Sequence, residues 1–300
     1  MSASPISAFP AVERSPVDAE SLSKFTTESE FTALGVDLLT EAASYVCIAC
    51  CVLGDKPTWA KEQAVVGGNA VRLYKLYSLY LEQTCERKRE LTDIIARLIF
   101  ETAVSVRYMV AHFSTGLVDS YMRQSMRYEK KLFDLIESNI ARREGVVLPI
   151  EDRMLKSLER ASKAANIPLE SINLKNKTAW GGKNLYEKTV SIGWEPAYLA
   201  VFSGMSHNVH GSWQDLLSHH LETHDDGRFS PELEWSTPRP QPLFALGLLA
   251  LEVVMDVVGF LGGPAAAEQL EGSIADLEER ILQVNAAHEK YLSGKLWPAI

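Results

Sequence analysis

Apolar residues recur at helical spacing along most of the chain, and this pattern constrains the fold more than any other feature. Residues three, four and seven positions apart share one face of an α-helix, whereas a half-buried strand needs strict alternation. The 300 residues contain no series of alternating segments and no internal repeat. The sequence therefore predicts an all-α protein, a multi-helix bundle in which paired long helices supply the core.

Turn and breaker residues divide this pattern into separate helices. Two adjacent glycines, Gly67 and Gly68, cost a helix about 2 kcal/mol relative to alanines, so they predict a kink or a close approach by a neighbour. We expect a small helix that ends at Ile192. We also expect longer helices over residues 31–53, 58–87, 90–113, 118–143, 150–166, 195–222, 243–261 and 265–292.

Two parts of the chain depart from helical spacing. Residues 1–27 are rich in Ser, Pro and Ala, and they predict a disordered, flexible leader. Residues 28–300 are expected to form a single helical domain, in which a sub-boundary could fall near 145–150. A small turn-rich insertion near 225–242 is expected to hold a hairpin or a lid.

One stretch, residues 243–263, has the length of a membrane span. Glu252 and Asp256 lie near its middle, and acids there cost about 2.5–3.5 kcal/mol each on insertion scales. We therefore expect the central helix of a soluble bundle and no membrane partner. The two acids are four residues apart on one helix face, so they require a basic or hydrogen-bonding partner, a metal or water.

Charge and cysteine content narrow the partners and the compartment. The net charge of −9 argues against a dedicated nonspecific DNA-binding protein. Residues 123–188 nevertheless carry 14 Lys plus Arg against 9 Asp plus Glu, which predicts a solvated helix surface or, alternatively, a modest basic face. No secretory signal is visible at the N-terminus. The four cysteines are Cys47, Cys50, Cys51 and Cys85, and we expect them to be buried free thiols in a reducing, cytoplasmic compartment.

Two polar constellations interrupt the apolar helical sequence. The first is Arg97-x3-Glu101 within RLIFETAVSVRYMVAH, and the second is Tyr198 with Ser206-x3-His210 within YLAVFSGMSHNVHGSW. An unpaired buried charge costs several kcal/mol, so charged groups in such helices must have partners. We therefore predict that the two strings meet in one internal polar site. The alternative is that Arg97 and Glu101 form only a partly exposed intrahelical pair.

The second string predicts a histidine that can exchange protons. If one helix runs from Ala197 to Gln214, Ser206 and His210 are i,i+4 neighbours and their side chains can hydrogen-bond. Such a histidine can act as proton donor or acceptor near neutral pH. The competing interpretation is a structural histidine that packs between helices and is satisfied by Glu101 or by a carbonyl group.

These patterns suggest a role for each residue. In the hypothetical catalytic group, His210 is the general acid or base, Glu101 is the carboxylate that orients it, and Ser206 supplies a hydroxyl. The hypothetical ligand-binding group anchors an anion through a guanidinium, and it consists of Arg97, Tyr198 and His207. We predict no metal and no other cofactor, because the doubled Glu-x2-His signature of helical metal sites and the glycine-rich phosphate loops are absent from the sequence.

Arg97-x3-Glu101, followed about a hundred residues later by Tyr198-x7-Ser206-x3-His210-Gly-Ser, resembles an uncharacterised bacterial helical family. That family is known only as a domain of unknown function, and the likeness covers roughly residues 30–225. The resemblance implies an all-α fold with a polar centre at these same positions, and it implies no established reaction.

Arg107-x4-His112 resembles the Arg-x4-6-His signature of HEPN ribonucleases, helical proteins of toxin and antiviral defence systems that cleave RNA as dimers without a metal. On an unbroken helix the two side chains lie about 140° apart, so they converge only if the helix is distorted. This resemblance implies a metal-independent ribonuclease with RNA as its partner.

The leading hypothesis is a soluble bacterial helical-bundle protein whose Arg/Glu/Tyr/Ser/His site binds a small anionic ligand. A HEPN-like ribonuclease and a non-enzymatic interaction or scaffold protein are the alternatives, so enzymatic and non-enzymatic interpretations both stay open. In a scaffold protein the polar centre would fix the helix register, and the amphipathic helix at 265–292 would mediate a homo-oligomer.

Overall fold

The computed structural model describes residues 9–54, 57–199 and 209–296, and this part of the chain is helical apart from one two-stranded sheet. The predicted all-α class is therefore confirmed. Contacts divide the protein into two compact units. Unit 1 comprises Met1–Val110 and Thr189–Ile300, and unit 2 comprises Ala111–Lys188. Residues 145–150, where the sequence offered a sub-boundary, lie inside unit 2.

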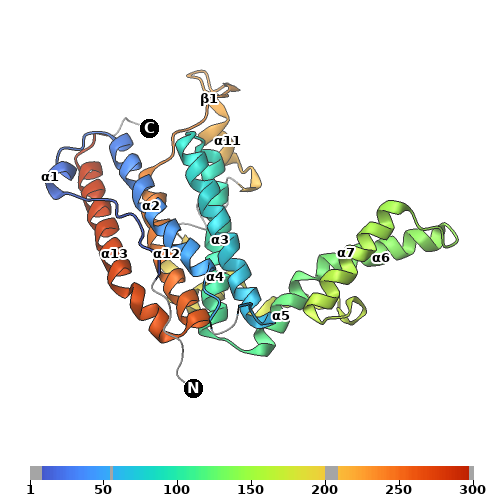
Figure 1. Cartoon of the computed structure of the whole chain (residues 1–300). Helices are drawn as coiled ribbons and strands as arrows, with labels where there is room; N and C mark the ends of the chain where they lie inside the picture. The colour runs from blue at the N-terminus through green and yellow to red at the C-terminus, as the bar shows by residue number, and fades with distance from the viewer. Residues whose placement is uncertain (1–8, 55–56, 200–208, 297–300) are drawn as a thin grey trace. The chain divides into compact units, whose positions relative to one another are not determined.

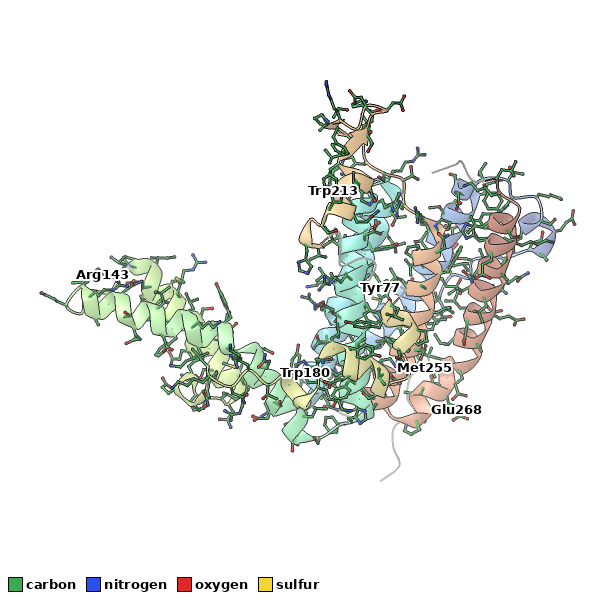
Figure 2. The ribbon with its side chains drawn as sticks, turned by 180° about the vertical axis from the view of Figure 1, so that it is seen from behind. Tyr77, Arg143, Trp180, Trp213, Met255 and Glu268 are labelled. Atoms are coloured by element: carbon green, nitrogen blue, oxygen red, sulfur yellow. The ribbon has the colours of Figure 1, made fainter. Side chains whose placement is uncertain are left out.

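Five long helices build unit 1, and Figure 1 shows them as α2 (Glu28–Cys50), α3 (Lys61–Cys85), α4 (Arg89–Ala111), α12 (Pro240–Gly262) and α13 (Pro264–Ser293). The central helix is α12, which contacts α2, α3 and α13. Its buried residues cover more than half of the helix circumference, and the remaining face carries Glu252 and Asp256. Tyr77 of α3, labelled in Figure 2, donates a hydrogen bond of 2.9 Å to the Leu246 carbonyl of α12.

Both α2 and α12 are long and apolar enough to cross a membrane. In each helix more than half of the most apolar window is buried inside unit 1, 56% in α2 and 61% in α12. Core helices of soluble proteins share these properties, and α12 occupies the core position that its sequence predicted.

The N-terminal stretch contacts unit 1 before α2 begins. Residues 1–8 of the expected leader lie outside the described residues. Beyond them the chain forms the short helix α1 (Ala19–Leu22), whose Leu22 is buried. Arg14 binds Asp276 of α13 at 2.9 Å. The sequence predicted that the ordered domain begins at Glu28. In the structure the chain already contacts the bundle before that residue.

Two hairpin strands and several short helices complete unit 1. The predicted helix over 195–222 is not continuous, because Gly211 has a φ of +58° and Ser212 caps a new helix by accepting from the Asp215 amide at 3.3 Å. The turn-rich interval does hold a hairpin, which begins slightly before it, with Glu222 opposite Ser230. These elements are α9 (Glu195–Ala197), α11 (Trp213–His219), β1 (Leu221–Thr223) and β2 (Phe229–Pro231).

Unit 2 contains three helices and two 3-10 turns: α5 (Thr115–Ser125), α6 (Arg127–Arg142), α7 (Pro149–Ala165), η1 (Leu169–Ser171) and η2 (Trp180–Gly182). The single helix expected over 118–143 is two helices that meet at Met126. Helix α6 packs against α7 and η1, and α5 packs against η2. Figure 2 shows Arg143 and Trp180 toward opposite ends of this unit. Helix α8 (Leu185–Ser191) then leads back to unit 1.

The four cysteines are free, as predicted, but they are less buried than expected. Cys51 and Cys85 are exposed, because both lie at helix ends, while Cys47 and Cys50 are half-buried. Burial raises the pKa of Cys50 to about 12, so its thiol stays protonated at neutral pH.

A buried ion pair joins α13 to α2. Arg280 donates from both Nη atoms to the Glu41 carboxylate, at 2.6 and 2.7 Å, and both side chains are buried. The same guanidinium donates to the Ser15 carbonyl at 2.8 Å and binds Asp276 at 2.7 Å. A network of this kind supplies each buried charge with a partner. Removing one member therefore leaves another charge buried without its partner, which destabilises the fold.

The substitution Glu41→Gln should lower the free energy of unfolding by about 3 kcal/mol, because it leaves the Arg280 guanidinium buried with too little negative charge. Urea denaturation measures this value. The matched control is Lys156→Ala, which breaks a solvent-exposed pair with Asp152 and should change stability by less than about 0.5 kcal/mol. If Glu41→Gln lowers the free energy of unfolding by less than about 1 kcal/mol, the pair does not stabilise the contact between α2 and α13.

The two adjacent glycines of α3 differ in their surroundings. A Cβ on Gly67 would lie 2.6 Å from the Trp59 ring, whose indole nitrogen is fixed by a 2.8 Å bond to the Val52 carbonyl. A Cβ on Gly68 would meet nothing within 4 Å. One helix runs through both positions, so of the two predicted explanations the close approach applies, and it applies to Gly67.

We expect Gly68→Ala to stabilise the protein by about 0.5–1 kcal/mol, since alanine restricts the unfolded chain and favours the helix. Gly67→Ala should instead destabilise it by about 1 kcal/mol, because the ring of Trp59 must move. Thermal unfolding of the two variants side by side tests the difference. Equal effects at both positions would contradict the close packing of Trp59 on α3.

Candidate functional site

The two predicted polar strings meet in unit 1. Arg97 of α4 donates from Nε to Glu101 Oε1 at 3.2 Å, and its Nη1 lies 3.4 Å from Nε2 of His210. A guanidinium can only donate hydrogen bonds, so Nε2 of His210 must accept in this contact. A hydrogen bond in this contact therefore requires the imidazole tautomer with its proton on Nδ1. We call Arg97, Glu101 and His210 the open polar site.

The sequence predicted an internal site, but the open polar site lies at the protein surface. The side chain of Glu101 is 38% exposed and that of Arg97 is 15% exposed, and His210 is exposed. Helix α4 buries its other side, including Ile99 and Phe100, in the core of unit 1. The helix therefore presents this polar group at the border between the core and solvent, where a ligand can reach it.

The remaining members of the predicted site are placed only in part. The ring of Tyr198 lies edge-on to the buried ring of Phe100, with centroids 6.4 Å apart, so it packs against the same helix that carries Arg97. Ser206 and His207 lie outside the described residues, and their assigned roles stay predictions. Gly211 ends the helical segment directly after His210.

The Glu101 carboxylate contacts Arg97, and its predicted role beside His210 stays a prediction. The structure gives it a bond to Arg97, and the link from Glu101 to His210 runs through that guanidinium. Ser105 donates to the Glu101 carbonyl at 2.8 Å one helical turn later, so it satisfies the backbone and leaves the carboxylate to Arg97. The three side chains thus form a chain of contacts with Arg97 in the middle.

A second polar cluster supplies the partner that the two acids of α12 required. Arg107 of α4 donates from Nε to Asp256 at 2.7 Å and from Nη1 to Glu252. The Trp194 indole donates to the Glu252 carboxylate at 3.2 Å, and the Arg107 guanidinium carbon lies 4.6 Å from the Trp194 ring centroid. Burial raises the pKa of Asp256, while its bond to Arg107 acts in the opposite direction.

This cluster bears on two of the predictions. Within the described ranges no group of three or more His, Cys, Asp or Glu side chains is placed to hold a metal ion. The guanidinium of Arg107 is occupied by two carboxylates and an aromatic ring. His112 lies exposed in the turn after α4 and belongs to unit 2, whereas Arg107 belongs to unit 1. The ribonuclease-like pair of Arg107 and His112 therefore stays a prediction.

A third cluster lies at the other end of α4, and the sequence did not predict it. His219 is buried, with Nδ1 at 3.0 Å from Ser236 Oγ and 3.4 Å from Glu90 Oε1. Glu90 accepts from the Ser236 amide at 3.1 Å, and its Oε2 is buried without a partner among the described residues. Asp215, one helical turn before His219, is buried as well.

His219 is buried, whereas His220 and His224, which follow it in the chain, are exposed. The available signal was the i,i+4 spacing of Asp215 and His219, which places both on one face of α11. That spacing does not reveal which face is buried, because the partner, Glu90, is more than a hundred residues away in the chain.

A model of a protein family of unknown function, DUF5677, matches residues 63–228, which is more than half of the chain. The chain belongs to this family. The DUF5677 match confirms the prediction of a helical family of unknown function, although it begins later than the predicted residue 30. It includes Arg97, Glu101 and His210 and excludes Glu252 and Asp256. No curated protein and no solved structure matches the chain.

The buried histidine of α11 should make the DUF5677 protein less stable in mild acid. Burial, and secondarily Arg89, lowers the pKa of His219, and these causes outweigh Glu90 and Asp215, which raise it. The unfolded state therefore binds more protons than the folded state as the pH falls below the ordinary histidine value of 6.5, and stability decreases with it.

Urea denaturation at pH 7.5 and pH 5.5 tests this effect. In His219→Gln the loss of stability between the two pH values should be smaller than in the wild type, because glutamine does not titrate. The exposed His220, on the same helix end, provides the control His220→Gln, which should keep the wild-type dependence. An unchanged pH dependence in His219→Gln would show that His219 is not the group responsible.

Proposed function

We propose that this protein is a soluble cytoplasmic protein that binds a small anionic ligand at the open polar site of unit 1. The observation that carries the proposal is the 3.4 Å contact between Arg97 and His210 at the protein surface. Two groups that can both carry positive charge are held together there, with one partly exposed carboxylate beside them.

The chemistry of this contact favours an anion as ligand. In the contact with Arg97, His210 accepts a hydrogen bond, which a protonated imidazole cannot do. An anion with two or more oxygens can instead accept from the guanidinium and from a protonated imidazole at the same time. Both of the new hydrogen bonds would be assisted by charge, which makes them stronger than the contact they replace.

Proton uptake follows from this exchange of partners. Binding converts His210 from an acceptor into a donor, so the affinity for the anion should rise as the pH falls from 7.5 to 5.5. Glu101 balances the charge of Arg97 while no ligand is bound and fixes the guanidinium in place. The exposure of the site favours ligand binding over a role in fixing helix register, for which a sealed network is expected.

The test is a titration followed by NMR signals of the His210 imidazole, which are assigned by their loss in His210→Ala. Inorganic phosphate, sulfate, acetate and citrate serve as probes. We expect at least one of them to shift the His210 signals saturably, with higher affinity at pH 5.5. Arg97→Gln should weaken that binding at least about tenfold, the effect of losing one charge-assisted bond.

Two hairpin variants provide matched controls. Arg228→Gln and His224→Ala remove the same kinds of side chain from an exposed hairpin, and they should leave the affinity unchanged. The proposal fails if none of the four anions moves the His210 signals at millimolar concentration. It also fails if Arg97→Gln binds the anions as tightly as the wild type.

A further inference from the structure

A polar hollow of about 290 Å³ lies entirely within unit 2, separate from the open polar site. It is lined by α5, by the first residue of α6 and by the segment 171–180 that folds back toward them. We call it the unit 2 hollow. The surplus of basic residues that the sequence places in 123–188 lies entirely in this unit.

Two asparagines line the hollow, and the side-chain oxygen of each already accepts a hydrogen bond. Asn173 accepts from the Lys175 amide and Asn176 accepts from the Thr178 amide, both at 2.9 Å. These bonds use the side-chain oxygens, and the NH2 groups are the parts of both amides that remain available for a ligand. The loop that carries them is thus arranged to offer donors rather than acceptors.

Two arginines add positive charge to the same lining. Arg123 binds Asp119 at 2.7 Å and Ser171 Oγ at 3.1 Å, so its charge is balanced within the hollow. Arg127 donates from Nη2 to the Leu174 carbonyl at 2.8 Å, a neutral acceptor, and within the described part of the chain no carboxylate is assigned to it as an ion-pair partner. The lining therefore holds one guanidinium whose charge a ligand can balance.

A rigid aromatic wall completes the hollow. Trp180, labelled in Figure 2, begins η2, and the Gly181 amide beside it donates to Ser120 Oγ of α5 at 3.0 Å. The Tyr121 ring lies edge-on to Trp180 with centroids 5.3 Å apart, and Lys188 Nζ lies 3.6 Å from the indole centroid. The wall is thus held in place by its neighbours on two sides.

From these observations we infer that the unit 2 hollow binds a nucleotide, with its phosphate on Arg127 and the amides of Asn173 and Asn176 and its flat part beside Trp180. Phosphate oxygens only accept hydrogen bonds, which matches a lining rich in donors with one unbalanced cation. The volume lies just below the usual range of ligand pockets, roughly 300–1,000 Å³, and so suits one nucleotide unit rather than a dinucleotide.

The nucleotide can be free or belong to an RNA strand, and the experiment separates the two sources. The indole NH signal of Trp180, assigned by its loss in Trp180→Phe, reports binding in NMR titrations. The probes are 5′-AMP, adenosine and a short oligoadenylate. We expect 5′-AMP to shift this signal saturably and adenosine to bind at least about tenfold more weakly, because it lacks the phosphate.

Two substitutions test the assigned contacts. Asn176→Asp keeps the oxygen that binds the Thr178 amide and replaces the donor with a negative charge, so the loop should fold normally and 5′-AMP should bind at least about tenfold more weakly. Arg127→Gln should have the same effect. The matched controls are Asn184→Asp, at the start of α8, and Arg153→Gln, exposed on α7, and both should bind 5′-AMP like the wild type.

Three results would overturn the inference. The Trp180 signal could fail to respond to 5′-AMP and to oligoadenylate, adenosine could bind as tightly as 5′-AMP, or Asn176→Asp could keep the wild-type affinity. Tighter binding of oligoadenylate than of 5′-AMP would support an RNA strand as the source, and equal binding would support a free nucleotide. His210→Ala should leave this titration unchanged, so the result is independent of the open polar site.

Discussion

The burial of the apolar faces of α12 is the constraint from which the arrangement of unit 1 follows. A helix whose apolar residues cover more than half of its circumference must be covered, and α2, α3 and α13 cover it. Its two acids then need a cation at the edge of the core, and Arg107 of α4 meets both. Helix α4 is in this way tied to α12 by charge, with the Trp194 ring against the guanidinium.

The same requirement that each charge have a partner separates structural from functional polar groups in this protein. Arg280 and Glu41 satisfy each other inside the core, where no ligand can replace either partner. Arg97 and His210 meet at the surface with a weaker contact, and the unit 2 hollow keeps donors and one guanidinium facing an open volume. Closed pairs stabilise the fold, whereas open ones can exchange a protein partner for a ligand.

The sequence predicted those features that depend on local patterns or on a missing partner. The all-α class, the central α12 and the hairpin followed from spacing and turn residues, and the encounter of Arg97 with His210 followed from the cost of unpaired charge. The break at Met126 has no glycine or proline to mark it, and the burial of His219 depends on Glu90, far away in the chain. The unit 2 hollow exists only because the loop at 171–180 folds back on α5, which no local pattern encodes.

The central claim is that Arg97 and His210 face each other in solution with the guanidinium as the donor. The most direct measurement is the tautomer of His210, read from the nitrogen chemical shifts of its imidazole near pH 7.5 in the absence of added anions. The structure predicts that Nδ1 carries the proton and Nε2 does not, and that Arg97→Gln shifts the ring toward the Nε2-protonated form. A His210 ring that is protonated on Nε2 in the wild type, and unaffected by Arg97→Gln, would contradict the contact and the site built on it.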